Sequence, residues 1–280
     1  MDKVPISVLI VTKNEGRNIA QCLNALQNFD EIIVIDSHSA DGTVSAAESF
    51  GVRIEQFKWN ARYPKKRQWC LDNLDLKHDR VLFIDADEEM TLALEAEIRA
   101  LDWQADGYFI KGQYVMGGVS LRFGMQNNKL CLFDRRKVAF PVVDDLDIEG
   151  MGEIEGHYQP VGKTDDIRLG QLKNALLHHA FAGHEERHDR YAQWEAEMIR
   201  RNAYPKDPVL WRENLKTVFR SMPLRAEVAF TQSYVFKLGF LDGVRGYRFA
   251  KSRYDYYRAV RDFKNQYKRG DLDLKARDAA

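Results

Sequence analysis

Residues 80–89, Arg80-Val81-Leu82-Phe83-Ile84-Asp85-Ala86-Asp87-Glu88-Glu89, pass from an apolar segment directly into a run of carboxylates. A continuous apolar run of this length is typical of a strand that is buried on both faces, as in a parallel sheet. In open α/β sheets, ligands bind beyond the carboxyl ends of such strands. This segment therefore predicts a buried strand with a binding site at its carboxyl end, where Asp85 and Asp87 lie.

Asp85 and Asp87 are separated by one residue, so both carboxylates can reach the same ligand. Two crowded carboxylates repel each other unless a cation lies between them. Their hard oxygens suit Mg²⁺ or Mn²⁺, and such ions commonly bridge to substrate phosphates. Asp-x-Asp is a short motif, however, and the alternative is a solvated acidic turn that leads into a helix at Thr91.

The composition of the 280-residue chain is that of a soluble globular protein, with 45% hydrophobic and 30% charged residues. This length accommodates one large core, or one domain with an appendage. The 42 basic and 42 acidic residues give a formal net charge of +0. No overall field favours nucleic acid, so we expect no nucleic-acid partner.

The three cysteines, Cys22, Cys70 and Cys131, are odd in number and form no Cys-x-x-Cys pair. This pattern predicts reduced thiols in the cytoplasm, with neither a zinc site nor a disulfide framework. The N-terminus shows no signal-peptide pattern, and no segment approaches the roughly 20 apolar residues that span a bilayer. We therefore expect a cytoplasmic protein that does not cross the membrane.

The first half of the chain alternates strand and helix patterns. Strands are expected at Ile6–Val11, Glu31–Ile35, Val52–Phe57 and Val81–Ile84. Helices are expected after each of the first three, at residues 19–26, at residues 44–50 and from Pro64 onward. This order predicts right-handed crossovers and an α/β, Rossmann-like, mostly parallel sheet with helices on both faces.

Polar loops follow the first two of these strands, and parallel strands bring them to the same edge as Asp85. The first loop carries Thr12, Asn14 and Glu15, and the second carries Asp36, Ser37, Asp41 and Gly42. A carboxylate such as Asp36 can accept hydrogen bonds from a ribose or a base, although no Gly-x-Gly-x-x-Gly motif precedes it. Phosphates would then be neutralised by metal and by Lys65 or Arg67. The alternative for the second loop is ordinary turn chemistry.

Three segments resemble the family 2 glycosyltransferases, which have the GT-A fold. They are Val8-Leu9-Ile10-Val11-Thr12-Lys13-Asn14-Glu15, Ile33-Val34-Ile35-Asp36-Ser37-His38-Ser39-Ala40-Asp41-Gly42-Thr43 and Phe83-Ile84-Asp85-Ala86-Asp87-Glu88. The later part of the chain resembles the branch that builds lipopolysaccharide core and other surface glycans. No Gln-x-x-Arg-Trp motif follows, which argues against the processive synthases of the same family.

The resemblance implies an inverting hexosyltransferase that moves a sugar from a nucleotide-diphosphate donor, UDP-linked, to a glycolipid or glycan acceptor. It implies that Glu15 and Asp36 hold the base and the ribose, that Asp85 helps to bind the nucleotide, and that Asp87 ligates Mg²⁺ or Mn²⁺. His38 stands where the motif often has glycine or asparagine, so the resemblance does not determine the conformation of the local turn.

An inverting transfer needs a base that accepts the proton of the acceptor hydroxyl, and a carboxylate with a raised pKa suits this task. Related members of the branch carry a His-Glu pair, and its best match here is Ile154-Glu155. Glu155 is the preferred base; Glu153 is second, because a shift of register would exchange them. Asp144 and Asp145 come third, and a polar loop without catalytic function is the alternative.

From Ala105 onward, short strands at residues 107–110 and 129–133 are expected to complete the sheet and to wall an acceptor cleft. His178 ends a further apolar run and is expected to face the site. Its spacing to neighbouring histidines matches no zinc motif.

The last third of the chain is helical, and it divides the protein into a GT-A domain, residues 1–182, and a helical extension, residues 183–280. One helix face carries Phe249, Tyr256, Val260, Phe263 and Tyr267, and basic residues surround it: Arg245, Arg248, Lys251, Arg258, Arg261, Lys264, Lys268 and Arg269. A basic helix with an aromatic stripe predicts peripheral contact with the anionic inner face of the cell membrane, or with a partner. The alternative is that the aromatic face packs in the core.

Two other functions remain open from sequence. Asp85-Ala86-Asp87 superficially resembles the nucleophile motif of haloacid-dehalogenase-like phosphohydrolases, although Glu89 occupies the place of that motif's usual threonine or valine. A non-catalytic scaffold of a glycan-assembly complex would bind a nucleotide sugar without turning it over. Turnover of a nucleotide sugar would indicate the glycosyltransferase, phosphatase activity would indicate the phosphohydrolase, and binding without turnover would indicate the scaffold.

Overall fold

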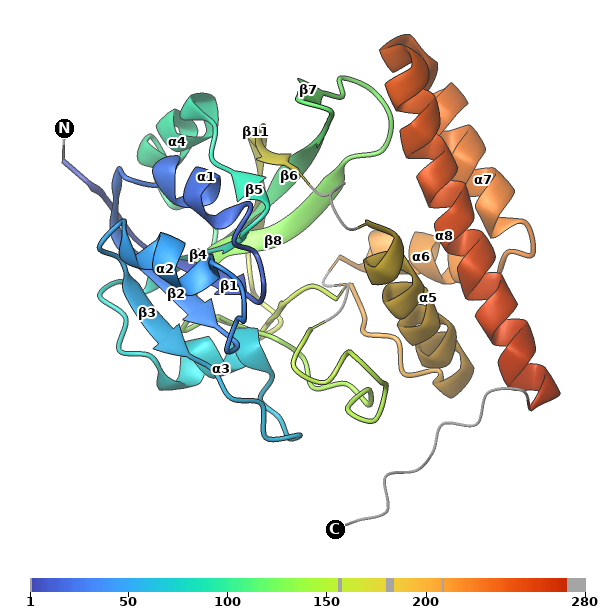
Figure 1. The fold of residues 1–280 in the computed structure, drawn as a ribbon, viewed down its shortest axis with the longest axis horizontal. Helices are drawn as coiled ribbons and strands as arrows, with labels where there is room; N and C mark the ends of the chain where they lie inside the picture. Colours follow the sequence, from blue (N-terminus) through green and yellow to red (C-terminus); the bar gives the residue numbers. More distant parts are fainter. Residues whose placement is uncertain (1, 156–157, 180–183, 208, 271–280) are drawn as a thin grey trace.

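The computed structural model describes residues 2–155, 158–179, 184–207 and 209–270, without the side chains of residues 184–187. Its centre is a mixed sheet with the strand order β3-β2-β1-β4-β8-β6-β11-β5 (Figure 1). The strands are β1 (Val4–Thr12), β2 (Phe29–Asp36), β3 (Arg53–Gln56), β4 (Arg80–Asp85), β5 (Glu88–Glu89), β6 (Gly107–Met116), β7 (Val119–Ser120), β8 (Asn127–Asp134), β9 (Val138–Ala139), β10 (Val161–Gly162) and β11 (Leu169–His178). The helices are α1 (Ile19–Asn24), α2 (Thr43–Glu48), α3 (Lys66–Asn73), α4 (Leu92–Arg99), α5 (His184–Arg201), α6 (Leu210–Ser221), α7 (Arg225–Thr231), η1 (Gln232–Phe236), η2 (Gly239–Asp242) and α8 (Gly243–Arg269).

The parallel half of the sheet is the one predicted from residues 80–89. β1 pairs in parallel with β2 and β4, and β2 pairs in parallel with β3. Val81 to Ile84 are all buried, because layers of protein cover both faces of β4. The register sets Thr12 beside Asp36 and Val11 beside Asp85, so the carboxyl ends of three strands meet at one edge.

The second half of the sheet mixes directions. β8 is antiparallel to both β4 and β6, which confirms that strands near residues 107–110 and 129–133 complete the sheet. β11 then pairs in parallel with β6 and antiparallel with β5. The last pairing places His178 opposite Glu88, so the end of β11 lies beside the acidic run that follows β4.

Helices cover both faces of the sheet, as the alternating pattern predicted. Helix α1 connects β1 to β2, and α2 connects β2 to β3, so the chain moves toward one edge of the sheet. Helix α3 connects β3 to β4, which lies on the other side of β1, so the chain then moves in the opposite direction. Right-handed crossovers therefore place α1 and α2 on one face and α3 on the opposite face. Cys22, Cys70 and Cys131 are buried in this core as free thiols.

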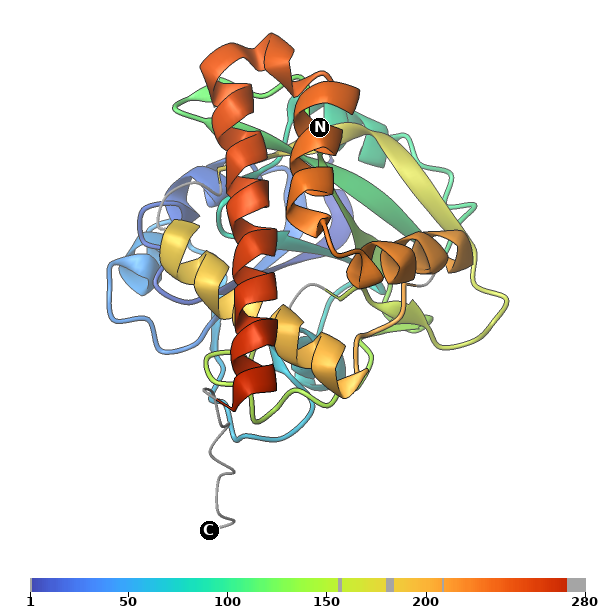
Figure 2. The same ribbon diagram turned by 90° about the vertical axis from the view of Figure 1, so that its right-hand side faces the viewer.

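The C-terminal helices form a layer beside the sheet, with the 27-residue helix α8 along its outer side (Figures 1 and 2). Trp194 and Met198 of α5 belong to the main core, so α5 is anchored on the part of the chain that holds the sheet. The expected domain boundary at residues 182 and 183 lies outside the described residues. In the part of the chain that the structure describes, no helix is long and apolar enough to cross a bilayer.

The aromatic stripe of α8 is a packing face. Val260 is buried against α5, and Tyr256, Phe263 and Tyr267 pack against the same small cluster. At the other end of the stripe, the Phe249 ring lies 4.8 Å from the ring of Tyr114 on β6. This arrangement corrects the expectation that these aromatic residues reach a membrane, because the side of α8 that bears them faces the protein.

Candidate functional site

The loops after β1 and β2 are tied together at the sheet edge. Asp36 is fully buried, and its carboxylate accepts hydrogen bonds from the N–H of Ser39, at 2.8 Å, and from the Ser39 hydroxyl. The N–H of Asn14 donates to Ser39 Oγ, and Asn14 Oδ1 accepts from the N–H of Ala40, both at 2.8 Å. Asn14 therefore holds the two loops in register, which leaves its side-chain oxygen committed to the loop.

His38 has a left-handed backbone conformation in the loop after β2. Its φ of 52° lies in the left-handed region, which glycine and asparagine adopt most readily. His38 thus adopts a backbone conformation that is more usual for glycine or asparagine.

Thr12 and Glu15 line the same edge. The Thr12 hydroxyl is buried and has no hydrogen-bond partner within the described structure. A buried hydroxyl of this kind is normally satisfied by a ligand or by water. Glu15 lies three residues further along the chain: its N–H donates to Thr43 Oγ1 and its carboxylate accepts from Asn18 Nδ2, both at 2.8 Å.

Asp85 lies between two cations. Its Oδ1 accepts from Arg67 Nη2 at 2.6 Å, and its Oδ2 accepts from Lys129 Nζ at 2.7 Å. Lys129 also pairs with the buried Glu88 at 2.7 Å. Burial raises the pKa of Asp85, but Lys129 and Arg67 outweigh burial and hold this pKa well below its usual range. The sheet edge therefore carries positively and negatively charged side chains in close ion pairs.

Lys129 and Glu88 are site residues that the sequence prediction missed. Glu88 belongs to the acidic run itself, so its position after β4 was a usable signal. Lys129 was harder to find, because it comes from an antiparallel strand, β8, whose pairing with β4 no local pattern specifies. Its one signal is a lysine that directly precedes the apolar run Leu130–Phe133.

Asp87 lies beside His178, so this histidine points toward the acidic residues that follow β4. His178 Nε2 is 3.5 Å from Asp87 Oδ1, and the His178 ring stacks on Tyr114 with centroids 5.1 Å apart. Burial lowers the pKa of His178, but the carboxylates of Asp87 and Glu88 raise it above its usual value. Burial likewise raises the pKa of Asp87, and His178 lowers it below its usual value.

The residues present fit a divalent cation that shares its coordination with a substrate. Asp85 and Asp87 supply hard oxygens, and no group of three His, Cys, Asp or Glu side chains in the described ranges encloses an ion by itself. Mg²⁺ is typically held by one or two carboxylates plus substrate phosphates and water. Asp87 is the better ligand of the two, because both oxygens of Asp85 already pair with cations. His178 Nε2 is close enough to Asp87 to share the same ion.

Lys65 does not face this site, which corrects the expectation that it neutralises donor phosphates. Its ammonium is fully buried and donates to Asp145 Oδ2 at 2.7 Å and to the carbonyl of Ile154 at 2.8 Å. The other expected basic residue, Arg67, is the one that reaches Asp85. Asp145 is fully buried in the same pair and also accepts from Trp194 Nε1 at 3.2 Å, so it serves the fold and is a poor candidate base.

We expect Lys65→Met to lower the free energy of unfolding by about 3–5 kcal/mol, because it leaves the Asp145 carboxylate buried without its cation. Urea unfolding followed by circular dichroism measures this change. Lys58→Met is the matched control, because Lys58 is exposed. Equal stability of the two variants would show that the buried pair contributes nothing.

The two candidate bases point to different parts of the site. Glu153 accepts from Ser37 Oγ at 2.9 Å and from Lys13 Nζ at 3.3 Å, so it lies at the loops after β1 and β2. Glu155 is buried at the start of α3, where its Oε1 accepts from the N–H of Arg67 at 2.6 Å. Arg67 thus contacts Glu155 through its backbone and Asp85 through its guanidinium. The Arg67 residue therefore lies between Glu155 and Asp85 and contacts both.

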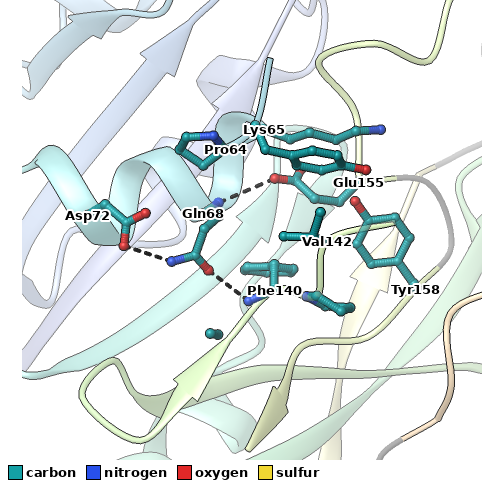
Figure 3. Close-up of a pocket in the computed structure, with 11 residues that line it drawn as sticks. Pro64, Lys65, Gln68, Asp72, Phe140, Val142, Glu155 and Tyr158 are labelled. Carbon is teal, nitrogen blue, oxygen red and sulfur yellow. Dashed lines mark hydrogen bonds between the residues drawn. The ribbon is translucent and has the colours of Figure 1, made fainter. Parts of the chain in front are cut away.

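Glu155 also lines a cavity of about 380 Å³ (Figure 3). Its other walls include Tyr63, Pro64, Lys65, Gln68, Asp72, Ala139, Phe140, Pro141, Val142 and Tyr158. Gln68 holds one wall in place, because its side chain donates to Asp72 at 2.7 Å and accepts from the N–H of Phe140 at 2.7 Å. Burial raises the pKa of Glu155 above its usual value, although the charge of Arg67 opposes this. A carboxyl with a raised pKa thus faces a largely apolar space.

The fold and the carboxylates at this sheet edge define a glycosyltransferase of the GT-A class. The chain belongs to glycosyl transferase family 2, whose family model matches residues 7–148. This match covers β1 to β4 and the loops described above, which confirms the resemblance seen in the sequence.

Two relatives that are named as glycosyltransferases support this assignment over part of their length. An uncharacterized glycosyltransferase of Rickettsia bellii is 40% identical over 94 residues, 33% of this chain and 31% of that protein. The lipopolysaccharide core biosynthesis glycosyltransferase LpsC of Rhizobium meliloti is 30% identical over 97 residues, 33% of this chain and 35% of that protein. The match thus spans about a third of each relative.

A solved structure extends the fold comparison to nearly the whole chain. The mannosyltransferase PcManGT of Pyrobaculum calidifontis, solved with GDP-Man and Mn²⁺, superposes with a TM-score of 0.51 at 15% identity. The alignment covers 95% of this chain and 88% of that structure. The shared fold therefore includes the C-terminal helices as well as the sheet.

Proposed function

We propose that this protein is an inverting hexosyltransferase that moves a sugar from a nucleotide-diphosphate donor, UDP-linked, to a glycolipid or glycan acceptor during synthesis of lipopolysaccharide or another surface polysaccharide. The observation that carries the proposal is the position of Arg67, which joins the buried Glu155 to the carboxylates after β4. The proposed base therefore lies next to the proposed site of the leaving group, as a single displacement at the anomeric carbon requires. The name of the relative LpsC supports the pathway.

The donor nucleotide is assigned to the loops after β1 and β2. Asp36 ends β2 as a buried carboxylate, rigidly held by Ser39, so its remaining lone pairs are fixed for a ribose or a base. The unpartnered hydroxyl of Thr12 supplies a further polar contact, and Ser37 is oriented by Glu153. Glu15 and Asn14 hold the first loop in the shape that this binding needs.

The diphosphate is assigned to the edge formed by Asp85, Asp87, Arg67 and Lys129. When the donor enters, its phosphates compete with Asp85 for Arg67 and Lys129, whose charges then offset the negative charge of the leaving diphosphate. A divalent cation, held when bound by Asp87 together with Asp85 or His178, supplies further charge stabilisation there. Positively charged groups fixed at this point lower the barrier because they need no rearrangement during the reaction.

The chemical step is a single displacement at the anomeric carbon. The acceptor oxygen forms its bond to that carbon while the bond to the diphosphate oxygen breaks, and the electron pair leaves with the nucleotide. The acceptor proton passes to Glu155, whose raised pKa suits proton transfer better than an ordinary glutamate. The cavity beside Glu155 gives the acceptor sugar room next to the base.

We expect nucleotide diphosphate to be released from one donor of a UDP- and GDP-sugar panel, only with acceptor and divalent cation present. Proton NMR of the product should show an anomeric configuration opposite to that of the donor. Retention of configuration would contradict the proposed displacement. Phosphate release from simple phosphomonoesters would favour the phosphohydrolase, and donor binding without turnover across the panel would favour the scaffold.

A glycolipid acceptor lies at a membrane surface, so the proposal also places the enzyme on the cytoplasmic face of the cell membrane as a peripheral protein. The basic residues of α8 were the sequence-based candidates for this contact. Arg258 and Arg261 do lie on its exposed or half-exposed side, where each has an acidic neighbour at 3.9 Å.

A further inference from the structure

Helix α6 presents its apolar side to solvent. Trp211, Leu215 and Val218 follow one another at helical spacing and are 64%, 60% and 54% exposed, and Met222 continues the row just beyond the helix. No residue of α6 is buried. An amphipathic helix of a globular protein normally turns such a stripe toward the core.

The charged side of α6 faces the protein. Arg212 and Lys216 pair with the buried Asp207, at 3.4 and 2.5 Å. The guanidinium of Arg220 lies 3.7 Å from the centre of the Tyr204 ring. These contacts fix the orientation of the helix, so its exposed stripe is held outward by specific interactions.

A second exposed apolar group lies at the turn between α7 and α8. Phe236, Phe240, Leu241 and Val244 are 77%, 45%, 55% and 68% exposed. We call these four residues the tip. Figure 2 shows that α6, α7 and the start of α8 lie on the same side of the molecule, with the tip at one end of it. Helix α6, which bears the exposed stripe, and the tip therefore lie on one side of the molecule, which we call the face.

The tip is also cationic. Lys237, Arg245 and Arg248 are exposed among its apolar residues and form no ion pair with any residue that the structure describes. The one acid of this segment, Asp242, accepts hydrogen bonds from the backbone N–H groups of Arg122 and Phe123 instead. Apolar side chains mixed with unpaired positive charges match the boundary between anionic headgroups and acyl chains.

We propose that the tip and the α6 stripe dock this protein on a membrane that contains anionic lipids. A second copy of the chain fits the face less well, because a two-fold contact of this face with itself would bring two sets of Lys237, Arg245 and Arg248 into one interface. The inference rests on the membrane residence proposed above. It does not depend on sugar transfer, because vesicle binding needs neither donor nor acceptor.

This face shares Arg245 and Arg248 with the basic residues first expected to bind lipid, but most of those residues lie elsewhere on α8. Arg258, Arg261, Lys264 and Lys268 occupy the second half of α8, whereas the tip lies at its start. A 27-residue helix is about 40 Å long, so the two candidate surfaces can be tested one at a time.

The test is cosedimentation of the full chain with phosphatidylcholine vesicles, with and without phosphatidylglycerol. The wild-type protein should bind the anionic vesicles, and less so at high salt. Phe236→Ser/Phe240→Ser and Trp211→Ser/Leu215→Ser should each weaken binding roughly tenfold or more, because these side chains lose their burial in lipid. Lys237→Gln/Arg245→Gln/Arg248→Gln should remove the preference for anionic lipid.

Two controls complete the experiment. Leu92→Ser changes a residue that is 84% exposed on α4, away from the face, and should leave binding unchanged. Replacing Arg258, Arg261, Lys264 and Lys268 by glutamine should also leave most of the binding intact. Unchanged melting temperatures show that each variant is folded.

Three results would overturn the proposal. The wild-type protein could ignore anionic vesicles at low salt, or the tip variant could bind as well as the wild type while the second-half α8 variant does not. Sedimentation of the free protein as a dimer that Phe236→Ser/Phe240→Ser dissociates, without vesicle binding, would assign the face to a second copy.

Discussion

Asp87→Ala should abolish sugar transfer and remove the effect of Mn²⁺ or Mg²⁺ on nucleotide binding. Asp87 is buried in the turn after β4, where its carboxylate lies beside His178, whereas both oxygens of Asp85 pair with cations. Loss of one charge-stabilising group at a reacting centre costs about 10²–10³ in rate, and here the bound cation is lost with it. Turnover with saturating cation, and calorimetric titration of UDP with and without Mn²⁺, measure the two effects.

The control for this prediction is Asp75→Asn, which changes an exposed aspartate outside the sheet edge. Asp87→Asn adds a variant of nearly the same shape, which keeps an oxygen beside His178 while it removes the charge. Both Asp87 variants should melt near the wild-type temperature. Near-normal turnover of Asp87→Ala in either cation would refute the assignment.

The parallel half of the fold follows from the sequence because its signals are local. Strands β1, β2 and β4 each carry an apolar run that ends in a polar residue, at Thr12, Asp36 and Asp85. Parallel strands must bring those ends to one edge, so the meeting of Thr12, Asp36 and Asp85 needed no knowledge of distant contacts.

The partners of the basic residues did not follow from the sequence. Lys65 and Arg67 are two positions apart at the start of α3, and successive positions on a helix point in directions about 100° apart. Which of the two reaches the site depends on Asp145, which lies 80 residues downstream of Lys65 and pairs with it. No periodicity specifies such a pairing, and the same holds for Lys129 on β8.

Helical spacing identifies an apolar face but does not say what that face contacts. The stripe of α8 and the stripe of α6 have the same kind of spacing. In the structure, Val260 is 1% exposed against α5, whereas Trp211 is 64% exposed. The difference arises from the pairs that Asp207 makes with Arg212 and Lys216, which hold the charged side of α6 against the protein.

Glu155→Gln should lower turnover by about 10²–10⁴ while the affinity for the donor nucleotide stays unchanged, because the base acts on the acceptor. Glu153→Gln should instead weaken donor binding, since Glu153 orients Ser37 and pairs with Lys13 at the nucleotide loops. Initial rates over a range of donor concentrations separate the two effects. If Glu153→Gln shows the loss of turnover and Glu155→Gln does not, Glu153 is the base.

The pH dependence of Glu155 then distinguishes a base from a structural cap of α3. Its pKa in the folded chain is raised above its value in the unfolded chain, chiefly by burial. The folded state therefore binds this proton more tightly, and ionisation of Glu155 makes folding less favourable as the pH rises between the two pKa values. Glu155→Gln removes that loss and keeps an oxygen that accepts from Arg67. Relative to the wild type, the variant should gain stability as the pH rises from about 4.3, the ordinary pKa of glutamate, through the raised pKa of Glu155 in the folded chain.

Denaturant unfolding of both proteins across this range, together with turnover at each pH, measures the two consequences in one series. A base with a raised pKa gives a wild-type rate that falls in acid through a pKa above about 4.3, the ordinary value of glutamate. The variant should be both slower and at least as stable at neutral pH. If Glu155→Gln instead loses stability in proportion to its activity at neutral pH, Glu155 caps α3, and the proton acceptor must be sought elsewhere along the cavity wall.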